Sequence, residues 1–584
     1  MISANPLQGR PRPAGAAPIV FALSLALSAL VPPGTAQGQA GTSASSVTPK
    51  SFEPPLQNLG GTLVFSGATA TKAPPGADQI AITLSDVDLQ GGLPQLRSAN
   101  AALKARLTGK RIPVSDLFDA VNALEEAYAN AGYVLVRVVL PQQNLRDGGV
   151  LKVEVINGFV ETVDNQNVPP QVQKRIDQLT APVVNRKGLT LAQLERQLLL
   201  AGDVAGVALG TALGAGRLPG GTVLTLDPEY RKITGFVGFD NFADDELGPF
   251  TLNAGVEFNS ILGHGETLYL RASGAPYKFL AGDPRYRILA AGALMPLGTS
   301  GLALNAEVTT SRTTPDNETV PTRSKFDRQS LRVIYPWIRS RRMNLTTTVS
   351  LDRQQDRQDL IVGPTTPIYN DRTTVLRAGG TLTYLHEGGA YTDVGAVLSQ
   401  GIDALGARML SDVDTGTPLS RQGADATFTK LTLAGYHEQP LGQRFLLSVM
   451  GRGQSSFGEA LLTAEQFGIA GPRELSAFDL GDLRGDSGWV FRAEMAHQTL
   501  ASLGTLPIMV SPYIFVAAGG ISLERPTAVE RGHEAAQAFG IGLDVFSKTE
   551  SRYRASSVRL EVAKGERDYG SDDTRFSISG NFRF

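Results

Sequence analysis

Phe576-Ser-Ile-Ser-Gly-Asn-Phe-Arg-Phe584 is the stretch that decides the fold of this chain. Its even-numbered positions are all apolar or glycine, whereas its odd-numbered positions are all polar or charged. A period of two predicts a half-buried β-strand. A soluble β-sandwich could contain such a strand, but a secreted chain that ends on one is more typical of a bacterial outer-membrane β-barrel, whose wall alternates between lipid and lumen. We therefore expect Phe576, Ile578, Phe582 and Phe584 to face lipid.

The start of the chain predicts secretion. Arg10 and Arg12 precede an apolar run over residues 19–31, and small residues follow up to Ala40. This order is that of a secretory signal peptide, which we place over residues 1–40. The run is shorter than the roughly 20 apolar residues that a transmembrane helix needs, and no other stretch is long enough. Any membrane crossing is therefore expected to be made by strands.

The amino-acid composition limits the classes of protein to which this chain can belong. The 64 glycines, 19% charged residues and mean hydropathy of −0.06 suit many short alternating strands better than one large soluble core. The absence of cysteine excludes disulfides, thiolate metal sites and a cysteine nucleophile. A net charge of −2 gives no electrostatic basis for binding nucleic acid. No Walker-type glycine-rich loop is present, and we predict no cofactor.

Three segments with different patterns follow before the barrel. Residues 41–78 are rich in Pro, Gly, Ser and Thr and have no sustained period, so we predict a flexible linker there. Residues 79–157 form a mixed α/β unit, whose helix carries a core-facing stripe, with Ser115 as its N-cap and Gly132 as the left-handed residue at its C-terminal end. A second α/β unit covers residues 158–230. The stripe consists of Leu117, Val121, Leu124 and Tyr128, and Thr190-Leu-Ala-Gln193 fits a capping box in the second unit.

Residues 231–584 have the pattern of a barrel wall. Trp489, Phe491, Ala493 and Met495 alternate with Val490, Arg492, Glu494 and Ala496, for example, which suits one face in lipid and the other in a wet lumen. At roughly 22 residues per strand and turn, this segment makes about sixteen antiparallel strands. The fold class expected is therefore a membrane β-barrel preceded by two α/β units.

Short motifs in this order resemble one family, the TpsB transporters of two-partner secretion. In the first unit the matches are Leu140-Pro-Gln142 and Gly148-Gly-Val-Leu-Lys-Val-Glu-Val-Ile-Asn-Gly158, and in the second they are Leu194-Glu195 and Leu198-Leu-Leu-Ala-Gly-Asp-Val-Ala-Gly206. In the barrel they include Tyr335-Pro-Trp-Ile-Arg-Ser340. The resemblance implies that the two α/β units are periplasmic POTRA domains of an outer-membrane transporter in a Gram-negative bacterium.

The resemblance also locates a pore loop that departs from the family pattern. The family's Val-Arg-Gly-Tyr signature falls on Leu475, Ser476, Ala477 and Phe478, and its strand signature Phe-x-Asp-x-Gly falls on Phe515, Ala517 and Gly519. The arginine and the aspartate that pair in the family are thus both replaced. Removing both partners of a buried ion pair can be nearly neutral, whereas removing one is costly. We hypothesise that the loop is held by packing, with Phe478 as its anchor, or is more mobile.

The function that the resemblance implies is export, not catalysis. The POTRA domains would capture a secreted partner, a β-helical adhesin or haemolysin, and the barrel would thread it outward. Outer-membrane lipid and the barrel-assembly machinery are the other expected partners, and Phe584 would be the assembly signal. The alternatives are a barrel-assembly factor of the same superfamily, a passive porin and a membrane-embedded hydrolase.

Some features favour other functions weakly. Gly485-Asp-Ser-Gly488 is similar to the nucleophile segment of trypsin-like proteases, but no matching His and Asp segments accompany it, so we interpret it as a turn. The five histidines lack the spacing of a zinc site, and we predict no metal. We interpret the luminal charges as a solvated wall with cross-strand ion pairs, the alternative being a role in guiding an unfolded polypeptide. These charges are Arg444, Arg452, Arg492, Glu494, Arg559, Glu561 and Arg575.

Overall fold

The structure is a computed structural model that describes residues 43–55, 63–65, 72–317, 319–413, 416–548 and 555–584. The predicted signal peptide over residues 1–40 lies outside the described residues, as do parts of the predicted linker. Among the described residues, no helix has both the length and the hydropathy needed to cross a membrane.

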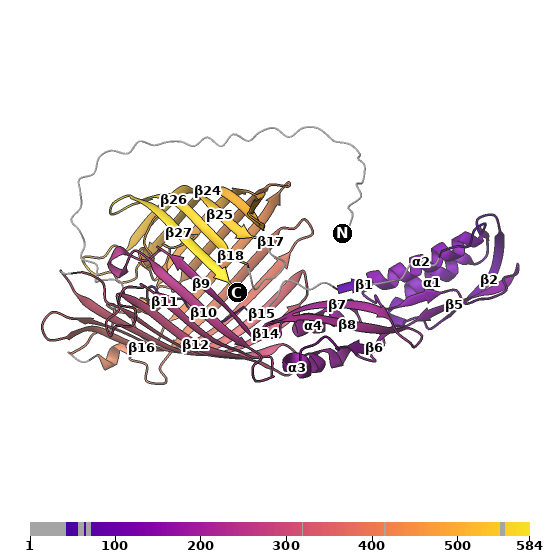
Figure 1. Cartoon of the computed structure of the whole chain (residues 1–584), viewed down its shortest axis with the longest axis horizontal. Coiled ribbons are helices and arrows are strands. Elements are labelled where there is room, and N and C mark those ends of the chain that lie inside the picture. Colours follow the sequence, from indigo (N-terminus) through magenta and orange to yellow (C-terminus); the bar gives the residue numbers. More distant parts are fainter. Residues whose placement is uncertain (1–42, 56–62, 66–71, 318, 414–415, 549–554) are drawn as a thin grey trace, which may run out of the picture. The chain divides into compact units, whose positions relative to one another are not determined.

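The first α/β unit is a four-stranded sheet with two helices (Figure 1). Its strand order is β3-β2-β5-β4, with β2 and β5 parallel. The predicted stripe of α2 is buried against this sheet, with Leu117 and Tyr128 at most 1% exposed. The elements are β2 (Ala81–Gln90), α1 (Arg97–Leu107), β3 (Arg111–Pro113), α2 (Val114–Asn130), β4 (Arg137–Val139) and β5 (Gly149–Ile156).

One helix boundary differs from the prediction. Helix α2 begins at Val114, directly after Pro113, so Ser115 lies in the first turn and does not cap the helix. Backbone carbonyls bind the first two helical amides instead, with Val114 donating to Ile80 at 2.7 Å and Ser115 donating to Ala77 at 3.2 Å, so these amides need no side-chain cap. Gly132 follows the helix with φ +90°, a left-handed conformation that favours glycine, as predicted.

The second α/β unit has the strand order β1-β7-β8-β6. Helix α4 starts with the predicted capping box, in which Thr190 and Gln193 bind each other's backbone amides. The short strand β1, from the region predicted as linker, pairs in parallel with β7. The elements are β1 (Leu63–Phe65), β6 (Phe159–Asp164), α3 (Pro170–Thr180), α4 (Leu191–Gly202), β7 (Val207–Ala215) and β8 (Gly221–Tyr230).

The rest of the chain forms a closed antiparallel barrel (Figure 1). Within the described residues it has sixteen strands, because β22 and β23 both pair with β24 and are two parts of one strand. The predicted fold class is therefore confirmed. The strands are β9 (Ile233–Asp240), β10 (Thr251–Asn259), β11 (Thr267–Gly274), β12 (Tyr286–Leu297), β13 (Leu302–Thr313), β14 (Thr322–Arg339), β15 (Met343–Leu360), β16 (Thr366–Leu385), β17 (Tyr391–Ile402), β18 (Thr429–Leu441), β19 (Phe445–Ser455), β22 (Ser487–His497), β23 (Thr499–Leu503), β24 (Leu506–Ser522), β25 (His533–Ser547), β26 (Ser557–Arg567) and β27 (Asp573–Arg583).

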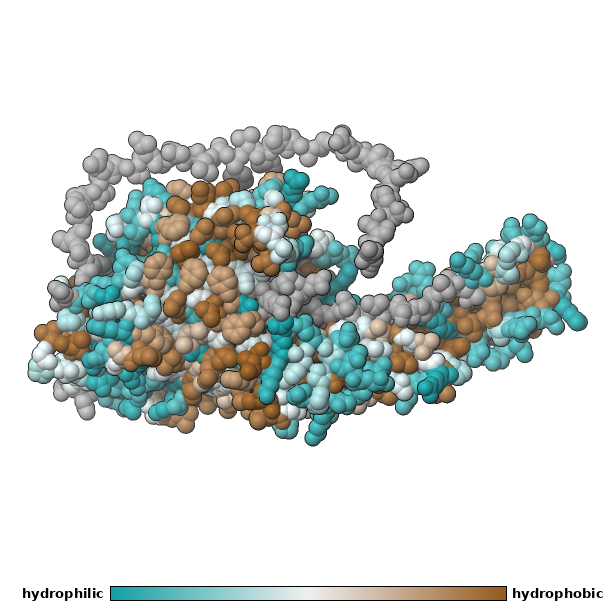
Figure 2. All heavy atoms as spheres, viewed as in Figure 1, coloured by the Kyte–Doolittle hydropathy of each residue, from teal (hydrophilic) through white to brown (hydrophobic). Residues whose placement is uncertain are grey.

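Alternation divides the wall into an apolar outside and a polar inside. On β27, Phe576 and Phe582 are 57% and 45% exposed, whereas Ser577 between them is 4% exposed. Figure 2 shows apolar side chains gathered over the barrel strands, with polar residues toward the rims. The barrel closes where β27 pairs with β9, from Ser579 opposite Asp240 to Arg583 opposite Phe236. The stretch that predicted the barrel is therefore its closing strand.

Candidate functional site in the barrel interior

Two segments of the described chain lie inside the barrel. One is the pore loop, residues 456–486, which joins β19 to β22 and contains the short strands β20 (Phe467–Gly468) and β21 (Arg484–Gly485). The other is the luminal segment, residues 43–55, which contacts the inner wall from β12 to β15. The composition of this second segment predicts linker, yet Ala44 and Val47 are at most 3% exposed.

The pore loop packs against the wall at the positions that the sequence indicated. Leu475, Ala477 and Phe478 share one buried cluster with Phe515 and Ala517 of β24. One wall glycine permits this contact. A Cβ atom at Gly565 would lie 2.6 Å from the Phe478 ring and 2.7 Å from the Ala477 methyl group. The structure thus brings the two signature positions together.

A buried ion cluster, the anchor cluster, holds the loop beside this apolar contact. Arg492 of β22 donates to Ser476 Oγ at 2.8 Å, to the Glu474 carbonyl at 3.1 Å and to Glu561 of β26 at 2.6 Å. Ser476 donates to the same Glu561 carboxylate. The Arg492 guanidinium also lies 3.5 Å from the centre of the Phe515 ring, a cation–π contact. Arg492 is 1% exposed, so its charge depends on these partners.

The charge arrangement at this contact is the reverse of the one that the resemblance implies. Position 476 of the loop supplies a hydroxyl instead of a guanidinium, and position 517 of the wall supplies a methyl group instead of a carboxylate. The guanidinium comes from Arg492, which is the register partner of Ala517 on the neighbouring strand. The wall thus carries the arginine, and the loop accepts from it. Sequence reasoning placed Arg492 in the lumen but did not identify it as the residue that binds the loop.

Further wall residues balance the charge of the anchor cluster. Arg559 of β26 pairs with Glu494 at 2.5 Å and with Asp544 at 3.1 Å. Tyr513 donates to Glu561 at 2.6 Å. The pair of Arg559 with Asp544 joins neighbouring strands, as expected from alternation, whereas Glu494 lies on β22, and Glu561 is buried and not solvated as predicted. These contacts fix the wall geometry against which the loop docks.

The two ends of the loop have ion pairs of their own. At one end, buried Glu465 pairs with Arg377 at 2.6 Å and with Lys430 at 2.7 Å. Burial opposes ionisation of Glu465, but Arg377 and Lys430 hold the pKa of this carboxyl well below its ordinary value. At the other end, Asp486 pairs with Arg421 at 2.5 Å and accepts from the Leu461 amide at 3.0 Å. Asp486 belongs to the protease-like Gly485–Gly488 motif, so its role here is structural.

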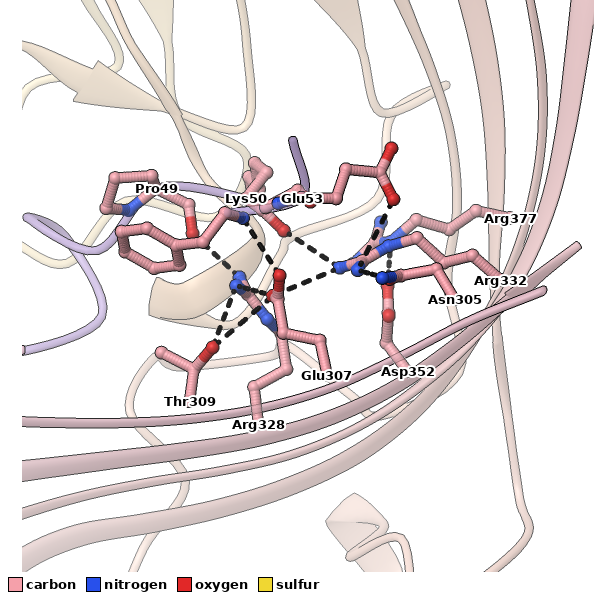
Figure 3. A network of polar contacts seen from close by, with 12 residues as sticks. Pro49, Lys50, Glu53, Asn305, Glu307, Thr309, Arg328, Arg332, Asp352 and Arg377 are labelled. Carbon is pink, nitrogen blue, oxygen red and sulfur yellow. Dashed lines mark hydrogen bonds and ion pairs between the residues drawn. The ribbon is translucent and has the colours of Figure 1, made fainter. Parts of the chain in front are cut away.

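The luminal segment is held differently, chiefly through its main chain (Figure 3). Arg328 donates to the Pro49 carbonyl at 2.9 Å, and Tyr286 donates to the Val47 carbonyl at 3.2 Å. The Phe52 amide donates to Glu307 at 3.0 Å. Glu307 is fully buried and also pairs with Arg328 at 3.2 Å and with Arg332 at 3.4 Å. These wall residues therefore have partners on the wall as well as in the segment.

One side chain links the two interior segments directly. Lys50 of the luminal segment donates to the carbonyl of Ala464 in the pore loop at 3.1 Å. The adjacent residue Glu465 is the carboxylate that pairs with Arg377 and Lys430. Sequence reasoning missed Lys50, Glu307 and Glu465. A charged residue between apolar neighbours in an alternating strand was the available signal for Glu307, whereas Lys50 had none.

A polar joint connects the second α/β unit to the barrel and unites two of the motifs quoted above. Arg339, from the Tyr335–Ser340 motif, donates to both carboxylate oxygens of Asp203 at 2.8 Å. Asp203 belongs to the Leu198–Gly206 motif. Arg196 donates to the carbonyls of Ser300 and Pro336 at 2.9 and 2.8 Å. Bidentate pairing of this kind fixes orientation as well as distance.

The remaining predicted positions lie elsewhere. Phe584 is 54% exposed, and its backbone exchanges two 3.1 Å hydrogen bonds with Gly235 of β9. His386 and His437 both contact the Thr392 hydroxyl at 2.8 Å, a proximity that their spacing did not indicate. Within the described residues, no group of three or more His, Asp or Glu side chains could hold a metal ion.

The chain has two α/β units followed by a sixteen-stranded barrel that encloses two segments of the chain. This combination is typical of one class of protein, the outer-membrane transporters with POTRA domains. The profile of the family described as haemolysin secretion/activation protein ShlB/FhaC/HecB matches residues 220–545, and that of the ShlB-type POTRA domain matches residues 82–158. The chain belongs to the haemolysin secretion/activation family. The resemblance to TpsB transporters is thereby confirmed, and the barrel lies in the outer membrane with the α/β units in the periplasm.

Individual relatives agree with this assignment. The heme/hemopexin transporter protein HuxB of Haemophilus influenzae is 23% identical over 396 residues, which are 67% of this chain and 67% of the relative. HuxB of H. influenzae strain 86-028NP is 30% identical over 164 residues, which are 28% of this chain and only 29% of the relative. The outer membrane transporter CdiB of Escherichia coli O6:K15:H31 is 24% identical over 279 residues, 47% of this chain and 46% of the relative.

Solved structures show the same fold. CdiB from Escherichia coli superposes with a TM-score of 0.67 at 19% identity, covering 93% of this chain and 94% of that one. CdiB from Acinetobacter baumannii gives a TM-score of 0.58 at 15% identity, with 94% and 95% covered.

Proposed function

We propose that this transporter exports a secreted protein partner as an extended chain, after the two α/β units have captured it in the periplasm. The partner would be a large β-helical adhesin or haemolysin. The sequence contains no Walker-type glycine-rich loop, and folding of the partner outside would give the direction, because removal of the unfolded form shifts the equilibrium by mass action.

One observation carries this proposal. The luminal segment is held inside the barrel chiefly by discrete polar contacts with the wall, and the pore loop by buried ion pairs together with one apolar cluster. Buried polar contacts of this kind can be exchanged for contacts with another polypeptide, whereas a packed apolar plug would have to be unfolded. A passive porin needs neither the α/β units nor a second interior segment. We further propose that the barrel-assembly machinery recognises Phe584.

Removal of residues 79–230 tests the capture step. The truncated chain and the full chain are each co-expressed with the product of the adjacent gene, and the amount of that product in the medium is measured. We expect secretion to fall to background for the truncated chain. Heat-modifiable migration in gels serves as the control that its barrel still folds. Undiminished secretion by a folded, truncated barrel would contradict capture by these units and favour a different route into the pore.

A further inference from the structure

Four positively charged side chains form a row on the outer face of the barrel. They are consecutive register partners on β12, β13, β14 and β15. An exposed apolar residue lies on the same face of each of these strands, so the row points outward, toward lipid. We call Arg287, Arg312, Lys325 and Arg357 the cation row. The apolar residues on the same face are Leu289, Val308, Leu331 and Val349.

The cation row has too few carboxylates to balance its charge. Like charges directly opposite each other on neighbouring strands are destabilising. Arg287 and Arg312 donate to backbone carbonyls of residues 279–282, and Asp283 of the same loop pairs with Arg323 instead. In the part of the chain that the structure describes, these two cations therefore have no carboxylate partner. The other two cations form the pairs Lys325–Asp327 at 2.7 Å and Arg357–Asp359 at 2.8 Å.

A groove of about 910 Å³ crosses the wall beside the row. It opens toward lipid, because the residues that line it include the exposed side chains Val237, Leu270, Leu289 and Val308. Its polar end includes Asp327 and Gln355. Each of these two residues is two positions from a cation of the row, a step of about 7 Å along a strand. An apolar groove that ends beside a row of cations has the charge and polarity of a site for an anionic lipid.

The row lies at the cell-surface end of the wall. The turn after β12 contacts the second α/β unit, because Arg196 donates to the Ser300 carbonyl at 2.9 Å. Arg287 lies at the opposite end of β12, beside the longer loop that precedes this strand. Since the α/β units are periplasmic, and the longer loops of such barrels are extracellular, the row belongs to the level of the outer leaflet.

We propose that the cation row and the groove together bind one molecule of lipopolysaccharide, the phosphorylated glycolipid of the outer leaflet. The row binds phosphates of the headgroup, and the groove takes an acyl chain. Arginine binds phosphate through two parallel hydrogen bonds, which are stronger than neutral ones. A soluble anion or an acidic polypeptide would use the cations alone, so the adjoining groove favours a lipid. The site is independent of the export function, because it faces the membrane and not the lumen.

The barrel offers a closely matched pair of lysines for the test. Lys325→Gln removes one cation from the row, and Lys564→Gln on β26 is its control. Both lysine side chains are 47% exposed, and each pairs with a carboxylate two residues further on that is 38% exposed. The register partners of Lys564, however, are the uncharged Phe539 and Thr574. The two variants therefore differ in whether the lost charge belongs to a row.

The probe is fluorescent lipid A, the phosphorylated anchor of lipopolysaccharide, titrated into the full-length proteins in an uncharged detergent. We expect Lys564→Gln to bind it like the wild type and Lys325→Gln to bind it about fivefold more weakly, the scale of one basic residue at a lipid surface. The double variant Arg312→Gln/Lys325→Gln should bind it about 25-fold more weakly. Heat-modifiable migration in gels verifies that each barrel is folded. Equal affinities of Lys325→Gln and Lys564→Gln would overturn the proposal.

Two further arms identify the source of the phosphate. Ala291→Trp fills the groove without changing a charge, so it should weaken lipid A binding about tenfold through the loss of acyl-chain burial. Inorganic phosphate and phosphatidylglycerol are the competitors, and we expect neither to displace lipid A at equal concentration. Displacement by inorganic phosphate would show an anion site without a lipid, and displacement by phosphatidylglycerol would show a general anionic surface. Either result, or equally tight binding of dephosphorylated lipid A, would overturn the proposal.

Discussion

The pore loop and the luminal segment share one lumen, but they are attached to it by different chemistry. The loop is held by side chains, with buried ion pairs at Glu465, Arg492 and Asp486 and an apolar contact at Phe478. The luminal segment is held mainly by main-chain groups, such as the Pro49 carbonyl that Arg328 binds. The two segments therefore differ in which wall residues would lose their partners if the segment left the lumen.

Departure of the loop would take a carboxylate away from a buried charge. Lys430 is buried, and its ion pair with Glu465 and its hydrogen bond to the Glu465 carbonyl would be lost together. Departure of the luminal segment would leave Glu307 still paired with Arg328 and Arg332. An unpaired buried charge is costly, whereas a main-chain hydrogen bond is easily replaced by water or by another polypeptide. The comparison indicates a permanent loop and a removable segment.

The largest effect should come from breaking the anchor cluster with Glu561→Gln. This change removes one carboxylate from Arg492 and Arg559, which keep their pairs with Glu494, so we expect a cost of about 1–3 kcal/mol. Urea unfolding of the purified protein in detergent measures it. The matched control is Glu566→Gln on the same strand, whose pair with Lys564 is exposed to solvent, so this change should leave the unfolding midpoint nearly unchanged. Equal shifts of the unfolding midpoint in both variants would show that the anchor cluster does not stabilise the loop.

A smaller effect is expected from restoring the family pair. Ser476→Arg alone places another guanidinium beside Arg492, so it should destabilise the fold, and Ala517→Asp supplies a carboxylate in register with Arg492. We expect the double variant to be more stable than the two single changes predict, with a coupling of about 0.5–3 kcal/mol. A double-mutant cycle on the unfolding midpoints gives this coupling. Additive effects on the unfolding free energy would mean that the side chains at positions 476 and 517 do not interact.

The same two positions also show which part of the site could be predicted from the sequence and which part could not. Alternation along Phe576–Phe584 and Trp489–Met495 predicted the barrel and its lipid face, because a wall strand has one dry and one wet side whatever its partners. The motif order located the loop against β24. The reversed anchor was not predictable, because the arginine at position 492 meets Ser476 only through the return of the loop into the lumen.

The luminal segment was missed for a different physical reason. Residues 43–55 are polar and contain prolines, which is the composition of a linker. They are held through carbonyl and amide groups that every residue possesses, so their side chains carry little signal of the contact. Hydrophobic periodicity and amino-acid composition therefore do not predict that a segment is bound through its main chain. It is also the mode that tolerates replacement by a partner of different sequence.

Deleting residues 43–55 should change conductance far more than stability. The wall ion pairs at Glu307 persist without the segment, so we expect the unfolding free energy to change by about 1–2 kcal/mol, the scale of a few hydrogen bonds to water-accessible groups. In planar lipid bilayers the deleted form should conduct continuously, whereas the full chain should be mostly closed. Closed traces for the deleted form would show that the pore loop alone blocks the lumen.

The smallest effect should follow from Lys50→Met, which removes the hydrogen bond to the Ala464 carbonyl and keeps the length of the side chain. Glu465 keeps its pairs with Arg377 and Lys430, so the loop should stay in place. A loss of about 1 kcal/mol corresponds to roughly a fivefold rise in the open fraction of single channels. Lys72→Met, at an exposed position outside the lumen, is the matched control and should leave that fraction unchanged. If Lys50→Met and the control have the same open fraction, Lys50 does not couple the two segments. The luminal segment would then leave the lumen without changing the stability of the loop.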